Sequence, residues 1–154
     1  MRERNRISIR SVRASDIATL VHWGAQSPEL WGSKVSKWYT ARGLKRYLLV
    51  LQNDIFLVAE IGEKLVGMCH ARYMHEWLYW ENLFVDKGFR RRGVAEKLFK
   101  EMVKACKKKK GLREIGLQVR HDNTEAKRFY KKMGFRMGFL YFWMEKDLIR
   151  RKKV

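Results

Sequence analysis

The pattern of apolar and polar residues predicts a strand and then helices in the first third of the chain. Residues 7–12 alternate apolar and polar positions, as a half-buried strand does. Residues 15–16 then offer an N-cap for a helix with apolar periodicity that runs to about Gly24. Residues 26–52 are less regular, and we expect a helix there that ends in the apolar run 47–51.

The middle of the chain predicts three strands and a long helix. Residues 55–61 and 64–73 have the composition of two strands joined by a hairpin turn at residues 62–63. Residues 77–85, rich in aromatic and β-branched side chains, predict a third strand. A helix that ends at Gly111 follows, because seven apolar residues recur on one of its faces: Val94, Ala95, Leu98, Phe99, Met102, Val103 and Cys106.

The last third predicts a strand, a helix and then strand again. Residues 114–119 favour a strand, residues 123–133 a helix closed by Gly134, and residues 135–148 one or two further strands. Strands and helices therefore alternate in the centre of the chain. That order favours an α/β fold with a mixed sheet, in which a helical crossover makes two central strands parallel.

The length and composition favour one compact domain. At 154 residues and 46% hydrophobic residues, the chain can bury a core of its own but is short for two domains. No apolar run reaches the roughly eighteen residues of a membrane span, and the first ten residues lack the apolar segment of a signal peptide. We therefore expect a single domain over residues 1–154 that is cytoplasmic and has no membrane partner.

The spacing of cysteine and histidine speaks against a metal site. Cys69 and Cys106 lie far apart, in a predicted strand and a predicted helix, without a further cysteine or a histidine at ligand spacing. The four histidines are scattered as well. We expect no metal, and we expect both thiols to be reduced, buried and unreactive.

The formal charge of +19 attracts polyanions from a distance. Much of this charge is peripheral, because Lys107–Lys110 end a predicted helix and residues 149–154 form a basic C-terminal tail. A solvated basic surface explains both runs as well as a binding surface does. Without a helix-turn-helix, zinc finger or RNP-type motif in the sequence, we expect nucleic acid to bind at most through nonspecific electrostatic contact.

The stretch RRRGVA, residues 90–95, lies between a predicted strand and the first turn of the long helix. Backbone N–H groups in a first helical turn have no partner within the helix and attract anions. Gly93 lets an oxygen approach without a Cβ in the way, and Ala95 keeps the turn slim. Because the donors converge on one point, the stretch suits a pyrophosphate better than a long nucleic-acid backbone.

These residues resemble the motif R/Q-x-x-G-x-G/A of the GNAT superfamily of acetyl-CoA-dependent N-acetyltransferases, which follows a strand of the form L-x-V. Leu83-Phe84-Val85 is similar to that strand end. The two motifs of the family together cover about residues 79–136, and the elements before them fit the family's order. The second half of the family pattern resembles Leu117-x-Val119-x-x-x-Asn123-x-x-Ala126-x-x-x-Tyr130-x-x-x-Gly134-Phe135.

The resemblance implies a single-domain GNAT-like fold, with a mixed, mostly antiparallel sheet flanked by helices. Its two central parallel strands would splay apart to admit the pantetheine arm of acetyl-CoA, which pairs with the L-x-V backbone in the family. Asn123 matches an asparagine that contacts the cofactor, although asparagine is also a common helix N-cap, and both roles are compatible. The residues implied for the arm are Leu83, Phe84 and Val85, and those implied for the pyrophosphate are Arg90, Arg91, Arg92, Gly93, Val94 and Ala95.

Acetyl transfer to an amine needs a group that protonates the departing thiolate. By resemblance, Tyr130 is this general acid and lies beside the sulfur of CoA. A phenol can donate to a thiolate without being charged itself at neutral pH. The alternative is a core tyrosine that packs between Phe129 and Met133.

The reaction also needs a base for the proton of the amine. Glu81 lies four residues before Val85, hence on the same side of a regular strand, and is a candidate; a strand-end ion pair is the alternative. Some relatives carry a glutamate on the following strand, where this chain has Gln118, and an amide cannot act as a base. The base therefore remains open between Glu81, His75 and bulk water.

The acceptor is expected to be a primary amine. A surface of charge +19 repels a small polyamine unless the pocket is locally acidic, so we favour a peptide or protein N-terminus or lysine. A small-molecule amine acetyltransferase and a non-catalytic module that binds CoA or nucleic acid are the alternatives, and a monomer or a homodimer is compatible with the sequence. Trp31 and Trp38 are candidates for an aromatic acceptor pocket, and most other tryptophans are expected in the core.

Overall fold

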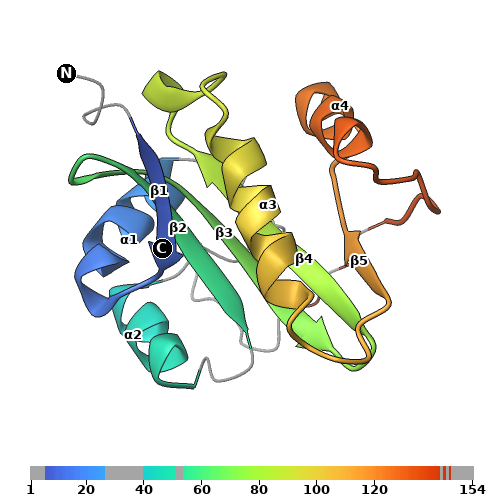
Figure 1. The fold of residues 1–154 in the computed structure, drawn as a ribbon, viewed down its shortest axis with the longest axis horizontal. Helices are drawn as coiled ribbons and strands as arrows, with labels where there is room; N and C mark the ends of the chain where they lie inside the picture. The colour runs from blue at the N-terminus through green and yellow to red at the C-terminus, as the bar shows by residue number, and fades with distance from the viewer. Residues whose placement is uncertain (1–5, 27–39, 51–53, 143, 145, 147–154) are drawn as a thin grey trace.

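The computed structural model of the chain describes residues 6–26, 40–50, 54–142, 144 and 146 (Figure 1). Trp31, Trp38 and Trp143 lie outside the described residues, as does the basic tail from residue 149. The aromatic acceptor pocket expected at Trp31 and Trp38 therefore stays a prediction.

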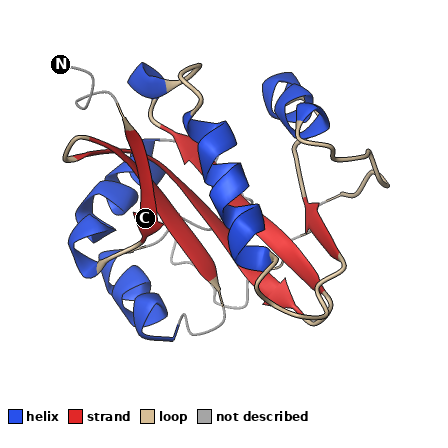
Figure 2. Ribbon diagram, viewed as in Figure 1, coloured by secondary structure: helices blue, strands red, loops and turns tan. Residues whose placement is uncertain are grey.

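Five strands, coloured red in Figure 2, form one sheet, and their order in the sheet is their order in the sequence. They are β1 Ile7–Ser11, β2 Ile55–Ile61, β3 Lys64–Met74, β4 Trp77–Val85 and β5 Glu114–Leu117. The first four pair antiparallel, whereas β4 and β5 pair parallel. A helix connects the parallel pair, as the alternation of elements predicted, so the mixed sheet is confirmed.

Helices cover both faces of the sheet. They are α1 Ile17–Gln26, α2 Ala41–Val50, α3 Val94–Cys106 and α4 Thr124–Lys132. Along β2, Ile55 and Ala59 lie in the hydrophobic cluster of α3, whereas Phe56 and Val58 lie in the cluster of α1. Because neighbouring side chains of a strand point to opposite faces, α1 and α3 cover opposite faces of the sheet. The inward face of α3 consists of residues expected from the sequence: Val94, Leu98, Met102 and Cys106.

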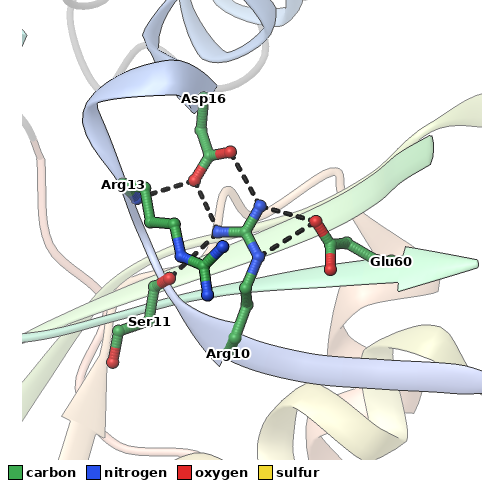
Figure 3. A network of polar contacts seen from close by, with 5 residues as sticks. All are labelled: Arg10, Ser11, Arg13, Asp16 and Glu60. Atoms are coloured by element: carbon green, nitrogen blue, oxygen red, sulfur yellow. Dashed lines mark hydrogen bonds and ion pairs between the residues drawn. The ribbon is translucent and has the colours of Figure 1, made fainter. Parts of the chain in front are cut away.

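An ion-pair network joins β1 to the start of α1 (Figure 3). Arg10 donates to both carboxylate oxygens of Asp16 at 2.8 Å and from Nε to Glu60 of β2 at 2.9 Å. Asp16 also accepts the backbone N–H of Arg13 at 2.7 Å, across the 3-10 turn Ala14–Asp16. The N-cap expected at residues 15–16 is thus corrected, because these residues lie inside the 3-10 turn, and the N-cap of that turn is Arg13. Burial raises the pKa of Asp16, but these hydrogen bonds outweigh it and the pKa lies below its ordinary value.

The C-terminal part departs from the expectation based on sequence. Residues 135–142, 144 and 146 are described without a strand, although the apolar pattern of residues 135–148 predicts one or two. β5 ends two residues earlier than expected, and it forms an edge of the described sheet. An apolar pattern makes a strand only where a neighbour offers a ladder of hydrogen bonds and a face to pack on. This segment packs little, since six of its large apolar side chains are each at least 70% exposed: Met137, Phe139, Leu140, Tyr141, Phe142 and Met144.

Candidate functional site

The parallel pairing of β4 and β5 stops halfway along β4. Partners run from Trp77↔Glu114 to Trp80↔Leu117, where β5 ends while β4 continues. Beyond Trp80, the edge of β4 that faces away from β3 has no strand partner among the described residues. Unpaired backbone N–H and C=O groups on such an edge can pair with an extended ligand. The divergence lies where the family resemblance places the splay between the two strands.

A β-bulge at Glu81 marks the same point. On the other side of β4, the register with β3 passes from His70↔Asn82 to Ala71↔Trp80, so Glu81 is an extra residue in β4. A bulge bends its strand and changes the direction of the side chains that follow. The end of pairing with β5 and the extra residue in β4 therefore coincide.

The bulge corrects one inference from the sequence. In a regular strand, Glu81 and Val85 would share a face. In the structure, Val85 packs against the cluster of α3, whereas Glu81 contacts His70, whose ring stacks on Phe56 in the cluster of α1. One inserted residue reverses the alternation, so Glu81 and Val85 lie on opposite faces.

Two basic side chains of β3 hold the Glu81 carboxylate. Its Oε2 lies 3.0 Å from Nδ1 of His70 and 3.0 Å from Nε of Arg72, and its Oε1 lies 3.4 Å from Nη2 of Arg72. Burial raises the pKa of Glu81, but the hydrogen bond and charge of His70 and the charge of Arg72 lower it by more. Since the pKa ends below its ordinary value, Glu81 is ionised at neutral pH.

The N-terminus of α3 presents unpaired backbone donors. The N–H of Lys97 bonds the carbonyl of Gly93 at 3.0 Å, so the N–H groups before Lys97 have no carbonyl one turn earlier. Gly93 precedes the helix with a φ of 81°, and a Cβ added there would meet no atom within 4 Å. Open space before aligned N–H groups, at the positive end of a helix dipole, suits a phosphate or pyrophosphate. The residues present therefore fit the anion that the sequence motif predicts.

The side chains around this helix start add positive charge. Arg90 donates from Nε to the carbonyl of Val85 at 3.1 Å, which ties the loop to the end of β4. Arg92 lies over the ring of Phe89, 5.3 Å from its centroid, and Lys64, the first residue of β3, lies over the same ring at 4.8 Å. Phe89 thus contacts two cations near the start of α3. Lys64 was missed by the sequence analysis because it follows a turn remote in sequence.

The helix α4 is capped at its start and joined to α3 near its end. The side-chain oxygen of Asn123 accepts the N–H of Ala126 at 3.0 Å, which confirms the N-cap role of Asn123. Lys132 pairs with Glu96 of α3 at 3.1 Å. Contact between Asn123 and a cofactor stays a prediction.

Tyr130 lies in an aromatic cluster between the sheet and α4. Its ring packs edge-on against Trp80 and Phe135, with centroids 6.0 and 5.5 Å apart. Burial, together with the nearby Cys69 thiol, raises the pKa of Tyr130 to about 12. The hydroxyl therefore keeps its proton throughout the neutral pH range and can serve as a donor.

The structure brings to Glu81 three residues that the sequence analysis did not single out: Asp54, His70 and Arg72. A signal for His70 was present, because it is the polar residue in the otherwise apolar run 66–71, and a buried polar group needs a partner. The identity of that partner depends on the register of β3 with β4, which no local pattern reveals. His75, the other candidate base, lies in the turn at the far end of β4 from Val85.

Other expectations concern thiols, metals and membranes. Cys69 and Cys106 are buried free thiols, as expected, and burial raises their pKa values to about 12 and about 11. Within the described part of the chain, no three His, Cys, Asp or Glu side chains are grouped to hold a metal ion. No helix of that part is long and apolar enough to cross a membrane.

Comparisons with known proteins agree with the geometry of the candidate site. Residues 21–135 match the Acetyltransferase (GNAT) family. The chain is 33% identical over 109 residues to the uncharacterized N-acetyltransferase MJ1207 of Methanocaldococcus jannaschii, with 66% of this chain and 47% of that protein covered. It thus spans about half the length of this relative. It is 25% identical over 135 residues to an aminoglycoside N(6′)-acetyltransferase type 1 of Salmonella enteritidis, with 80% of this chain and 90% of that protein covered.

A solved structure shows the same fold. The PaiA N-acetyltransferase of Thermoplasma acidophilum, crystallised in complex with coenzyme A, superposes with a TM-score of 0.75 at 22% identity. The likeness covers 86% of this chain and 91% of that chain. At 22% identity, this similarity shows a shared fold and nothing more.

Proposed function

The chain belongs to the GNAT family of acetyl-CoA-dependent N-acetyltransferases, and we propose that it acetylates a primary amine of a peptide or protein, at an N-terminus or a lysine. One observation carries the transfer reaction: the unpaired edge of β4 runs from the bulge to Val85, and a short loop with the 3-10 turn Lys87–Phe89 connects it to the open N-terminus of α3. A strand edge can hold an extended arm, and a helix N-terminus can hold phosphates. The two features together suit one elongated ligand that has both parts.

Acetyl-CoA supplies an acetyl group activated as a thioester. The open space at Gly93 supports binding of its pyrophosphate there, and the contact of Arg90 with Val85 keeps that site beside the unpaired edge. Asn123 is assigned a cofactor contact from the start of α4. The remaining assignments are the backbone of Leu83, Phe84 and Val85 for the arm, and Arg91, Arg92, Val94 and Ala95 for the pyrophosphate.

Two side chains carry the proton transfers in this proposal. Glu81, ionised and located where β4 and β5 diverge, takes the proton of the acceptor amine directly or through a water. Tyr130, whose hydroxyl stays protonated, supplies the proton to the departing thiolate. Of the three bases left open by the sequence, we choose Glu81 over His75 because of its place at the divergence.

The charge of the site supports a peptide acceptor over a small polycation. Both carboxylates near the bulge contact basic side chains. Glu81 contacts His70 and Arg72, and Asp54 contacts His70. They therefore leave little uncompensated negative charge to offset the repulsion of a surface of charge +19. A peptide carries one reacting amine and can bring its own acidic side chains.

An aminoglycoside is the second candidate acceptor. The observation in its favour is the 25% identity to an aminoglycoside N(6′)-acetyltransferase over 80% of this chain. An aminoglycoside carries several ammonium groups, so its binding would require acidic groups other than Glu81 and Asp54, which contact basic side chains.

Release of free CoA thiol from acetyl-CoA tests these proposals. The acceptor panel contains peptides with a free N-terminus, the same peptides blocked at the N-terminus but with a lysine, polyamines and aminoglycosides. We expect saturable turnover with at least one peptide class. Turnover with aminoglycosides alone would replace the peptide by the second candidate. Thiol release no faster than in buffer, with every amine, would contradict acetyl transfer itself.

A further inference from the structure

A fully buried histidine lies at the bulge, between two carboxylates. His70 has no exposed surface, and its ring stacks on Phe56 with centroids 5.0 Å apart. Its Nδ1 lies 3.0 Å from Oε2 of Glu81, and its Nε2 lies 3.3 Å from Oδ2 of Asp54. The imidazole thus joins the residue before β2 to the extra residue of β4.

The number of N–H groups on the imidazole ring determines to how many carboxylates it can donate a hydrogen bond. A neutral imidazole carries one N–H, so it can donate to one carboxylate only, while its other nitrogen lone pair faces the second. The imidazolium form carries two N–H groups and can donate to both carboxylates. With a carboxylate oxygen at each nitrogen, the ring of His70 is held between Asp54 and Glu81.

The two carboxylate oxygens of Glu81 differ in their contacts with basic side chains. Oε2 is bound by both His70 and Arg72 at 3.0 Å, whereas Oε1 has its nearest described donor, Arg72 Nη2, at 3.4 Å. An ionised carboxylate anchored through one oxygen keeps lone pairs on the other for a proton.

We propose, on the premise that Glu81 is the base of the proposed acetyl transfer, that His70 is its positioning residue. His70 anchors Oε2 of Glu81 at the bulge and leaves Oε1 for the acceptor amine, and Asp54 holds the ring of His70 from its other nitrogen. The charged and titratable groups around this pair come from three strands or their ends: Asp54 before β2, Arg72 of β3 and Tyr79 of β4. Burial and the charge of Glu81 raise the pKa of Tyr79, so its phenol stays neutral beside them.

Two substitutions of His70 separate its two nitrogens. In asparagine the amide nitrogen is bonded to Cγ, as Nδ1 of histidine is, so His70→Asn retains a donor towards Glu81. In glutamine the amide nitrogen lies one bond further out, nearer the place of Nε2, so His70→Gln retains a donor towards Asp54 and releases Glu81. We expect His70→Gln to lower kcat by about tenfold to 100-fold, the scale of a misplaced catalytic group. We expect His70→Asn to lose less, and both to leave the acetyl-CoA KM within about twofold, since neither touches the helix N-terminus.

The pH profile gives a readout that a purely structural role would not move. Removing the charge of His70 raises the pKa of Glu81, so the acidic limb of kcat/KM moves to higher pH in both variants. Asp54→Asn tests the same point with an intact His70, because it removes the carboxylate that lies at Nε2 of the ring. Because the charge of Asp54 raises the pKa of Glu81, its removal should move the acidic limb to lower pH, while the loss of the contact that holds His70 should lower kcat at pH 8. His22→Asn, which removes an exposed histidine of α1, is the control and should change neither quantity.

The outcomes decide the role of His70 separately from the proposed function. If wild-type protein acetylates no amine, the proposed function fails, and the carboxyl 13C titration of Glu81 then tests the anchor without turnover. A folded His70→Gln variant with wild-type kcat and an unshifted acidic limb would overturn the positioning role. If His70→Gln does not fold, Asp54→Asn decides, and a wild-type kcat in that variant overturns it.

Discussion

The indole N–H of Trp80 donates to the backbone carbonyl of Asn82 at 2.9 Å, so that one side chain bridges the bulge. The same ring stacks on Phe99 of α3 and packs edge-on against Tyr130. Trp80 is also the last residue of β4 that pairs with β5. A single buried residue thus connects the point where the strands diverge with the proposed general acid.

This connection predicts the effect of Trp80→Phe on cofactor binding. An aromatic ring remains, although it is smaller than the buried indole, but the carbonyl of Asn82 loses its donor and the edge of β4 beyond the bulge is less well held. Because one neutral hydrogen bond contributes roughly 1 kcal/mol, the acetyl-CoA KM should rise by about fivefold. Trp23→Phe, which removes an indole from the cluster of α1 on the opposite face, should lower the melting temperature without this change in KM. Equal acetyl-CoA KM values for the two variants would show that Trp80 does not support cofactor binding.

Acetyl-CoA should raise the melting temperature of the protein, because a ligand bound by the folded state stabilises it by mass action. Gly93→Leu should abolish that increase, since its side chain would occupy the open space before the first turn of α3. Gly111→Leu is the matched control: Gly111 also has a positive φ, 86°, and open space around it, but follows the other end of α3. Both variants carry the backbone strain of a left-handed residue, about 1–2 kcal/mol. A ligand-induced shift that survives in Gly93→Leu would place the anion elsewhere.

Tyr130→Phe should lower kcat at least tenfold, because general acid catalysis is typically worth about 100-fold to 10,000-fold and water can replace part of it. The aromatic packing on Trp80 and Phe135 remains, so stability and acetyl-CoA affinity should change little. Tyr73→Phe removes a hydroxyl from β3 outside the site and should leave kcat unchanged. With a pKa of about 12, Tyr130 should cause no loss of rate between pH 6 and pH 9 through its own ionisation. Loss of stability without loss of rate would make it a core residue.

Glu81→Gln should slow acetylation most at low pH, where the acceptor amine depends on a base to lose its proton, and least near pH 9. The pKa of Glu81 lies below its ordinary value, so the wild-type carboxylate is active down to the acidic limb. Steady-state rates from pH 6 to pH 9 test this. A pH profile parallel to that of the wild type would mean that Glu81 serves only as an ion-pair partner of Arg72. A larger effect from His75→Asn would favour His75 as the base.

Asp16→Asn should lower the free energy of unfolding by about 1–3 kcal/mol at pH 7, since it weakens a charged hydrogen-bond pair with Arg10 in a nearly buried position. Because the pKa of Asp16 is lowered by folding, the carboxylate stabilises the protein above its unfolded pKa of about 4. This contribution is lost as the pH falls through the folded value. Urea unfolding should therefore show a constant difference between wild type and variant above about pH 5 and a shrinking one below about pH 4. A difference independent of pH would mean that the carboxylate is not the stabilising group.

The sequence by itself determined the features that depend on neighbouring residues. The period of Val94, Leu98 and Met102 places α3 and its buried face, because helix periodicity is local. Asn123 as a cap and Gly93 before a helix likewise follow from the backbone preferences of single residues. The alternation of elements implies the mixed sheet, because few connections between them are sterically feasible.

Only the tertiary structure decided what depends on register between distant strands. One extra residue in β4 puts Glu81 on the face opposite to Val85 and next to His70 of β3, and a count of two along the strand cannot reveal this. The apolar run after Phe135 likewise makes no strand in its described part, because strand formation requires a paired edge as well as an apolar pattern. Register and edge pairing are set by contacts between residues far apart in sequence, which local periodicity does not encode.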